Sequence, residues 1–292
     1  MTESLLGTVE VMLRGLALPG VLPVIATFLG LIVGSFLNTV IHRLPQMLER
    51  EWHAQCEELA GRVTQPARFN LLVPRSRCPK CETTIRAQHL VPVLSWLVLR
   101  GRCAACGTQI SPRYPLVELG TTVMFVAAAG RFGATLEWVA ACVVLGFLIA
   151  LALIDLDTHY LPDQLTLPLL WLGLAASLAG DTAAAVWGAI IGYLSLWLVY
   201  QVFRLATGKE GMGHGDFKLL AALGAWLGPA ALLPIVLLSS FAGAAVGLVL
   251  IFFFGRERHE PLAFGPYLAV AGVIVMLCGE TLPGEFVFAS GR

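Results

Sequence analysis

The stretch that decides the fold runs from Leu219 to Gly255 and reads LLAALGAWLGPAALLPIVLLSSFAGAAVGLVLIFFFG, with no charged side chain in 37 positions. A helix that crosses a bilayer needs about 20 apolar residues, because its backbone polar groups must be satisfied internally where water is absent. The stretch is too long for one such helix, and Gly228-Pro229 together with Pro234 supply a natural break. We therefore expect two membrane-spanning helices here.

Six further apolar segments outside this stretch pass the same test. Glu118 is the only charged residue among them, and it makes its segment the weakest case. The segments are Leu16–Ile41, Pro115–Gly130, Trp138–Ile154, Gln164–Gly180, Thr182–Phe203 and Pro261–Gly279. The composition agrees, because 57% of the residues are hydrophobic, only 13% are charged and the mean hydropathy is +0.79. A soluble domain would carry roughly 25% charged residues. An ordinary soluble enzyme is thus excluded, and we predict an all-α polytopic membrane protein with about eight transmembrane helices.

The distribution of basic residues predicts how the chain is oriented. The 19 basic and 19 acidic residues cancel to a formal net charge of zero, which indicates no nucleic-acid partner. Eleven of the 19 basic residues nevertheless lie between His42 and Tyr114, the only polar stretch long enough for a separate module. Loops rich in Lys and Arg stay on the cytoplasmic side. We expect three parts: an N-terminal segment with the first span (1–41), a cytoplasmic module (42–114) and a membrane-embedded domain of seven helices (115–292).

Four of the seven cysteines form two CxxC pairs inside this module, at Cys78 and Cys81 and at Cys103 and Cys106. Each pair can direct two thiolates to one tetrahedral ion, so together they predict a closed, structural zinc site. Metal binding would supply folding free energy that a small module lacks. Disulfides are the alternative, but a cytosolic module sits in a reducing compartment.

Carboxylates within or at the end of membrane spans are costly and are functional candidates. Asp155 directly follows the apolar run that ends at Ile154, and Asp216 directly precedes the long apolar stretch. Two spans separate them, so both should lie at the cytoplasmic membrane face. Two carboxyl groups close together in a partly dry site share a proton, which suits one as base and the other as acid in peptide hydrolysis. Read singly, each could instead be a helix cap or a solvated loop charge.

Neighbouring residues compete for these roles. Asp157 differs from Asp155 by about 200° around a helix, so only one of the two can face Asp216. We expect Asp155 to face it, because it is joined directly to the apolar run. Asp163 follows a proline and fits the first turn of the next helix. The three glycines at 211, 213 and 215 fit a need for close backbone approach and unusual backbone angles beside a reactive side chain.

Taken together, these residues resemble those of the type IV prepilin peptidases, the leader peptidases and N-methyltransferases of bacterial type IV pilus and type II secretion systems. The likeness extends over nearly the whole chain. The motifs that carry it are GSFLN at 34–38 with RLP at 43–45, the double CxxC, Asp155 with LPD at 161–163, GHGD at 213–216 and FGPY at 264–267. The GHGD motif matches the GxGD pattern of intramembrane aspartyl proteases.

The resemblance implies that Asp155 and Asp216 are catalytic and that the four paired cysteines bind zinc. It implies a multi-pass protein of the bacterial inner membrane whose substrates are prepilins and pseudopilins. Their short basic leader would be cleaved after Gly at the cytoplasmic face. The new amino terminus, usually Phe, would then be methylated with S-adenosylmethionine. No residues for that cofactor can be named, because no Gly-rich nucleotide fingerprint is visible. The alternatives are a peptidase without methyltransferase activity and, as a different class, an ion-coupled membrane transporter.

Overall fold

A computed structural model describes residues 20–62, 69–209, 211–255 and 262–279 of the chain. The start of the first predicted span, residues 16–19, and Pro261 at the start of the last lie outside these ranges. The described residues form helices with two isolated β-bridges and no strand of a sheet. They divide into two compact units, Met1–Cys142 and Val143–Arg292, and helix α5 runs through the boundary.

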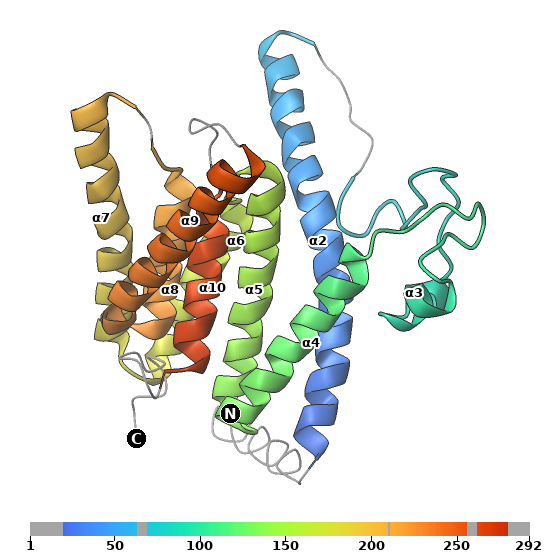
Figure 1. Cartoon of the computed structure of the whole chain (residues 1–292), viewed down its shortest axis with the longest axis horizontal. Coiled ribbons are helices and arrows are strands. Elements are labelled where there is room, and N and C mark those ends of the chain that lie inside the picture. The colour runs from blue at the N-terminus through green and yellow to red at the C-terminus, as the bar shows by residue number, and fades with distance from the viewer. Residues whose placement is uncertain (1–19, 63–68, 210, 256–261, 280–292) are drawn as a thin grey trace. The chain divides into compact units, whose positions relative to one another are not determined.

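The first unit is built on α2 (Val21–Leu59) and α4 (Arg113–Phe132), which pack closely side by side (Figure 1). A Cβ atom at Gly34 would lie 2.7 Å from the Cα atom of Glu118, so only glycine permits this approach. One turn further along α2, the Asn38 side chain donates a hydrogen bond to the Tyr114 carbonyl oxygen at 3.0 Å. One turn forward on α2 thus corresponds to one turn back on α4, which establishes that the two helices are antiparallel.

Helix α2 continues well past the predicted end of the first span at Ile41. It passes Pro45 without a break and ends only at Leu59, so the polar residues 42–59 extend the spanning helix (Figure 1). The remaining module includes the 3-10 helix Ala87–Leu90 and the short helix α3 (Leu94–Val98). Arg43 on α2 ties the start of this part, because its guanidinium donates to the carbonyl oxygen of Asn70 at 3.0 Å.

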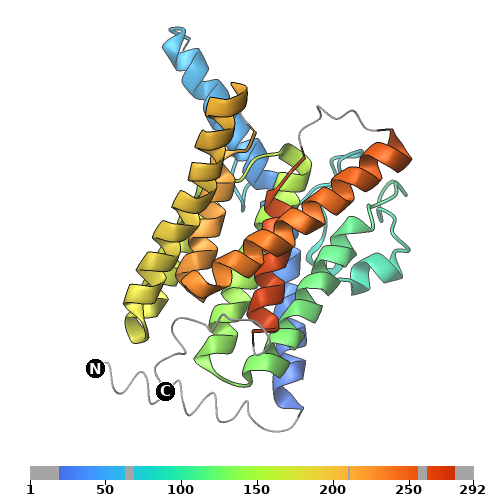
Figure 2. The same ribbon diagram turned by 60° about the vertical axis from the view of Figure 1, so that its left-hand side comes forward.

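The second unit contains most of α5 and five further helices (Figure 2). They are α5 (Leu136–Thr158), α6 (Asp163–Ala176), α7 (Thr182–Thr207), α8 (His214–Leu227), α9 (Leu232–Phe254) and α10 (Gly265–Leu277). Helix α8 is central, and all its residues from Leu219 to Leu227 are buried. Gly188 of α7 meets Gly224 of α8 backbone to backbone, so a Cβ atom on either residue would clash.

The predicted break in the long apolar stretch is confirmed at Gly228-Pro229. Helix α8 ends at Leu227, a 3-10 turn covers Pro229–Ala231, and α9 begins at Leu232. Pro234 does not contribute to the break; it lies in the first turn of α9, where a proline removes no helical hydrogen bond.

Eight helices of 13 residues or more lie within the described ranges, and each corresponds to one predicted span. Four stretches among them are long and apolar enough to cross a membrane: Val21–Leu59, Leu136–Thr158, Thr182–Thr207 and Pro229–Phe253, the last of which joins the 3-10 turn to α9. The membrane-protein class is confirmed, whereas the count of eight transmembrane helices is not. Helix α8 shows why composition overcounts: a short helix that is apolar on every side can be buried by its neighbours instead of facing lipid.

Candidate active site and metal centre

Asp155 lies in the last turn of α5, and its side chain is only 5% exposed. Its Oδ2 atom accepts a hydrogen bond from the backbone N–H of Gly265, at 3.0 Å. Gly265 is the first residue of α10, so the positive end of that helix faces the carboxylate. Helix α5 ends directly after this point, because His159 adopts a left-handed backbone conformation with φ 52°. The buried carboxylate is thus held by a helix 110 residues further along the chain.

Asp216 lies in the first turn of α8 and is 7% exposed. Its Oδ1 atom is buried and has no hydrogen-bond partner among the described residues. An unpaired buried carboxylate oxygen costs free energy unless something else satisfies it. The position therefore suits a group that meets a water molecule or a substrate.

Leu161, in the loop after α5, lies against two glycines, one next to each carboxylate. A Cβ atom on Gly215, the residue before Asp216, would lie 2.7 Å from the Cβ atom of Leu161. A Cβ atom on Gly265 would lie 3.1 Å from Leu161 Cδ1 and 2.7 Å from Asp155 Oδ2. The structure thus brings the two predicted aspartates into one buried site.

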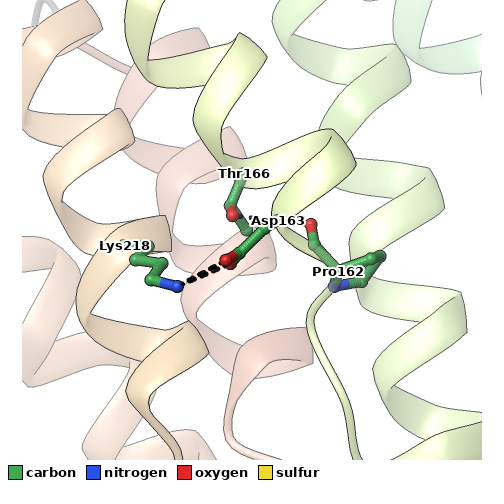
Figure 3. Close-up of polar contacts among 4 residues, drawn as sticks. All are labelled: Pro162, Asp163, Thr166 and Lys218. Atoms are coloured by element: carbon green, nitrogen blue, oxygen red, sulfur yellow. Dashed lines mark hydrogen bonds and ion pairs between the residues drawn. The ribbon is translucent and has the colours of Figure 1, made fainter. Parts of the chain in front are cut away.

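The predicted neighbours of the pair take the expected positions. Asp157 is exposed, which favours Asp155 as the residue that faces Asp216. Asp163 is in the first turn of α6, as predicted. Its carboxylate also forms an ion pair with Lys218 of α8, with Nζ to Oδ1 at 2.6 Å (Figure 3). This pair connects the start of α6 to the turn of α8 that carries Asp216.

The glycine prediction is correct in part. Gly215 is needed for close approach to Leu161, and a Cβ atom on Gly211 would meet the Phe203 ring at 2.7 Å. None of the three glycines has a positive φ, however, so the expectation of unusual backbone angles is wrong. Gly213 is the extended residue that precedes α8, with φ −77°. Extended geometry is usual before a helix and is open to other residues.

The four paired cysteines form one cluster, with all four Sγ atoms within 4.8 Å of one another. The Sγ atoms of Cys78 and Cys106 are 3.7 Å apart. Sulfur ligands about 2.3 Å from a tetrahedral ion lie about 3.8 Å from each other, so the cluster fits one metal ion. All seven cysteines are free thiols, which speaks against the disulfide alternative.

The two CxxC pairs sit in hairpins of the same build. The amide of Cys78 donates to the Thr83 carbonyl at 3.0 Å, and the amide of Cys103 donates to the Thr108 carbonyl at 2.8 Å. Hydrogen bonds with the Thr108 side chain and backbone also lower the pKa of the Cys106 thiol to about 6. A thiolate is the form that binds metal, so this lowered pKa suits a ligand.

Three contributors to the aspartate site were missed in the sequence: Gly265, Leu161 and Lys218. Gly265 and Leu161 belong to the FGPY and LPD motifs, but a motif does not show that a backbone N–H or an apolar side chain will lie against a carboxylate. Lys218 is two residues from Asp216, which was a usable signal. Its partner Asp163 is 55 residues away in the chain, so local sequence patterns could not predict the ion pair.

Two protein families match this chain, one in its N-terminal half and one in its C-terminal half. The family described as Bacterial Peptidase A24 N-terminal domain matches residues 28–132, and the Type IV leader peptidase family matches residues 142–248. A protein of Stutzerimonas stutzeri named prepilin leader peptidase/N-methyltransferase is 49% identical over 267 residues, which covers 90% of this chain and 92% of that protein.

Two further relatives carry the same name. The protein of Aeromonas hydrophila is 52% identical and covers 86% of this chain and 89% of its own length. The protein of Pseudomonas aeruginosa is 47% identical over 90% of this chain and 92% of its own. No solved structure matches the chain. The similarity extends through both units, and the chain belongs to the type IV leader peptidase family.

Proposed function

We propose that this protein removes the leader peptide of type IV prepilins and pseudopilins and methylates the new amino terminus. The burial of Asp155 and Asp216 in one site carries the peptidase part of the proposal. Family membership and the names of relatives that are about 50% identical support both activities.

In the proposed cleavage, one aspartate acts as base and the other as acid. The carboxylate takes a proton from a water molecule as the water oxygen attacks the carbonyl carbon of the leader's last glycine. The other aspartate, which is protonated from the start, then donates its proton to the departing amine as the C–N bond breaks. The Gly265 N–H holds Asp155 in place, and the unpaired Oδ1 of Asp216 can meet the water or the carbonyl oxygen.

The proposed sidedness places residues 42–114 and both aspartates at the cytoplasmic face of the bacterial inner membrane. Eleven basic against five acidic residues in 42–114 give this part a local charge of +6, which favours the cytoplasm. A basic leader stays on the same side for the same reason. Asp155 lies in the last turn of a helix long enough to span, which would put it at a membrane face, whereas the acids of transporters tend to lie near the midplane at interrupted helices.

The proposed cofactors are zinc and S-adenosylmethionine. Cys78, Cys81, Cys103 and Cys106 would hold zinc in a closed site, where it would cross-link the two hairpins and stabilise the module. S-adenosylmethionine would supply the methyl group for the new amino terminus. We assign no residue to its binding.

Cleavage of a prepilin by the full chain in detergent tests the catalytic assignment. Asp155→Asn and Asp216→Asn should each abolish leader removal, whereas the exposed Asp157→Asn serves as the matched control and should retain it. Substantial cleavage by either of the first two variants would refute the pair. Mass spectrometry of the product tests methylation separately, because a product without the mass of an added CH₂ group would leave a peptidase only.

A further inference from the structure

Within the module, residues 90–99 form an apolar run, LVPVLSWLVL, in which Ser95 is the only small polar residue. Helix α3 lies inside this run and turns three of its four large side chains outward. Leu94 is 59% exposed, Leu97 is 58% exposed and Val98 is 73% exposed, while Leu90 and Val91 are almost half exposed. A cluster of this kind is costly in water and indicates an interaction surface.

The run is fixed to the spanning helices through a buried acid. The backbone N–H of Val93 donates to Oε2 of Glu118 at 2.7 Å, and Glu118 is only 7% exposed. Val93 has φ 58° and ψ −50°, a positive-φ conformation that a β-branched residue rarely adopts. The Glu118 carboxylate meets the amide of this strained residue, directly before α3 begins. Glu118 has no part in the proposed cleavage, so its burial calls for another role.

This attachment fixes the level along the spanning helices at which α3 begins. Glu118 packs against Gly34, whereas the start of the module is tied to Arg43, the first Arg or Lys after the apolar part of α2. Nine residues of helix separate Gly34 from Arg43, or about 14 Å along α2 at 1.5 Å per residue. Val93, directly before α3, is therefore attached to Glu118 on the membrane side of Arg43, at the level of the apolar part of α2.

The other side of α3 is mounted on the second CxxC hairpin. The Trp96 side chain donates its Nε1–H to the Ile110 carbonyl oxygen at 3.2 Å. The same ring lies so close to Gly101 that a Cβ atom there would be 2.9 Å from it. Cys103 follows two residues later. The hairpin and Glu118 thus hold α3 from both sides and leave Leu94, Leu97 and Val98 outward.

We propose that residues 90–99 insert into the lipid bilayer beside α4, so that the module is partly embedded in the membrane and the occupant of its apolar surface is lipid acyl chain. A run of ten residues is too short to span and has the length of an interfacial segment. Helix α4 exposes apolar side chains of its own, Leu116, Leu119 and Val123, as expected of a helix in contact with lipid.

The charged residues beside the run and the shape of its surface also fit lipid as the occupant. Arg86, Arg100 and Arg102 flank the run and are exposed, so their guanidinium groups can reach lipid phosphates. A shallow hollow on this surface is lined by Val91, Leu94, Val98 and Leu99 together with the polar residues Gln88, His89 and Ser95. The proposal rests on the chain being a membrane protein and is independent of its catalytic activity.

Photo-crosslinking of the full chain in native membrane vesicles tests this insertion. The photoreactive amino acid p-benzoylphenylalanine replaces Val98 in one variant and Leu97 in a second, which covers a loss of expression at either position. Phe28, exposed on the apolar part of α2, is the lipid-facing control, and Glu51, exposed on its polar extension, is the water-facing control.

We expect positions 97 and 98 to gain the mass of a phospholipid with a yield comparable to position 28, and position 51 to give only background. Two results would overturn the proposal. One is a yield of lipid adduct at both test positions no higher than at position 51. The other is an adduct with protein alone, which would assign the surface to a second copy of the chain or to a protein partner. Because no step depends on leader cleavage, an inactive protein can still pass or fail this test.

Discussion

The backbone N–H of Gly265 donates a hydrogen bond to Asp155 Oδ2 at 3.0 Å, and the Gly265 Cα carries no side chain that could push the carboxylate away. This contact joins the start of α10 to the end of α5. Glycine is needed here for the space it leaves, because a Cβ atom would lie 2.7 Å from the same oxygen.

Gly265→Ala should therefore displace Asp155 and lower leader cleavage by about 100-fold, the scale of loss that follows from a misplacement of about 1 Å. The rate of prepilin cleavage in detergent measures the effect. Gly243→Ala is a matched control, because its new Cβ would meet the Tyr267 ring at 3.5 Å, an ordinary contact distance. Equal rates for the two variants would contradict the role given to Gly265.

The ion pair between Asp163 and Lys218 should align α8 more than it stabilises the fold. The two side chains are 44% and 29% exposed, and pairs of this kind contribute at most about 1 kcal/mol to stability. We expect Lys218→Met and Asp163→Asn each to slow cleavage severalfold with little change in melting temperature. The double variant should be no slower than the slower single one, because the pair is already lost. Additive losses would show that the two residues act separately.

The backbone contact between Gly188 and Gly224 should limit what side chain α8 can carry at this point. Gly224→Ala forces α7 and α8 apart, and overpacking of this kind typically costs about 1–3 kcal/mol. Thermal unfolding in detergent measures the loss. Gly146→Ala on α5 is the control, since its new Cβ would have no atom within 4 Å in the part of the chain that the structure describes. That variant should be neutral or slightly more stable.

Loss of the proposed zinc should unfold the cysteine module and leave the second unit intact. Cys81→Ser should remove the metal, measured as zinc per chain, and should make the region around residues 69–112 sensitive to protease. Cys56→Ser, outside the cluster, should retain both metal and resistance. A full complement of zinc in Cys81→Ser would contradict the four-thiolate site.

Much of the candidate site could be predicted from local patterns. Charge is so scarce in this chain that a carboxylate at the end of an apolar run stands out. Helical periodicity indicated that only one of Asp155 and Asp157 can face Asp216, and adjacency to the apolar run favoured Asp155. The CxxC spacing likewise predicted a four-sulfur cluster because two residues between cysteines direct both thiolates to one point. These features depend on neighbours a few residues apart, and the structure agrees with them.

By itself, the sequence determined the membrane class, the helix break at Gly228-Pro229 and which acids and cysteines to consider, because hydropathy, proline and spacing act locally. Only the tertiary structure decided that residues 219–227 of α8 are all buried, that Lys218 pairs with Asp163 and that Gly265 holds Asp155. It also decided that Val93, directly before α3, is bound to Glu118 of α4. These relationships join residues 25 to 110 positions apart, and packing between helices, which local patterns do not encode, brings such residues together.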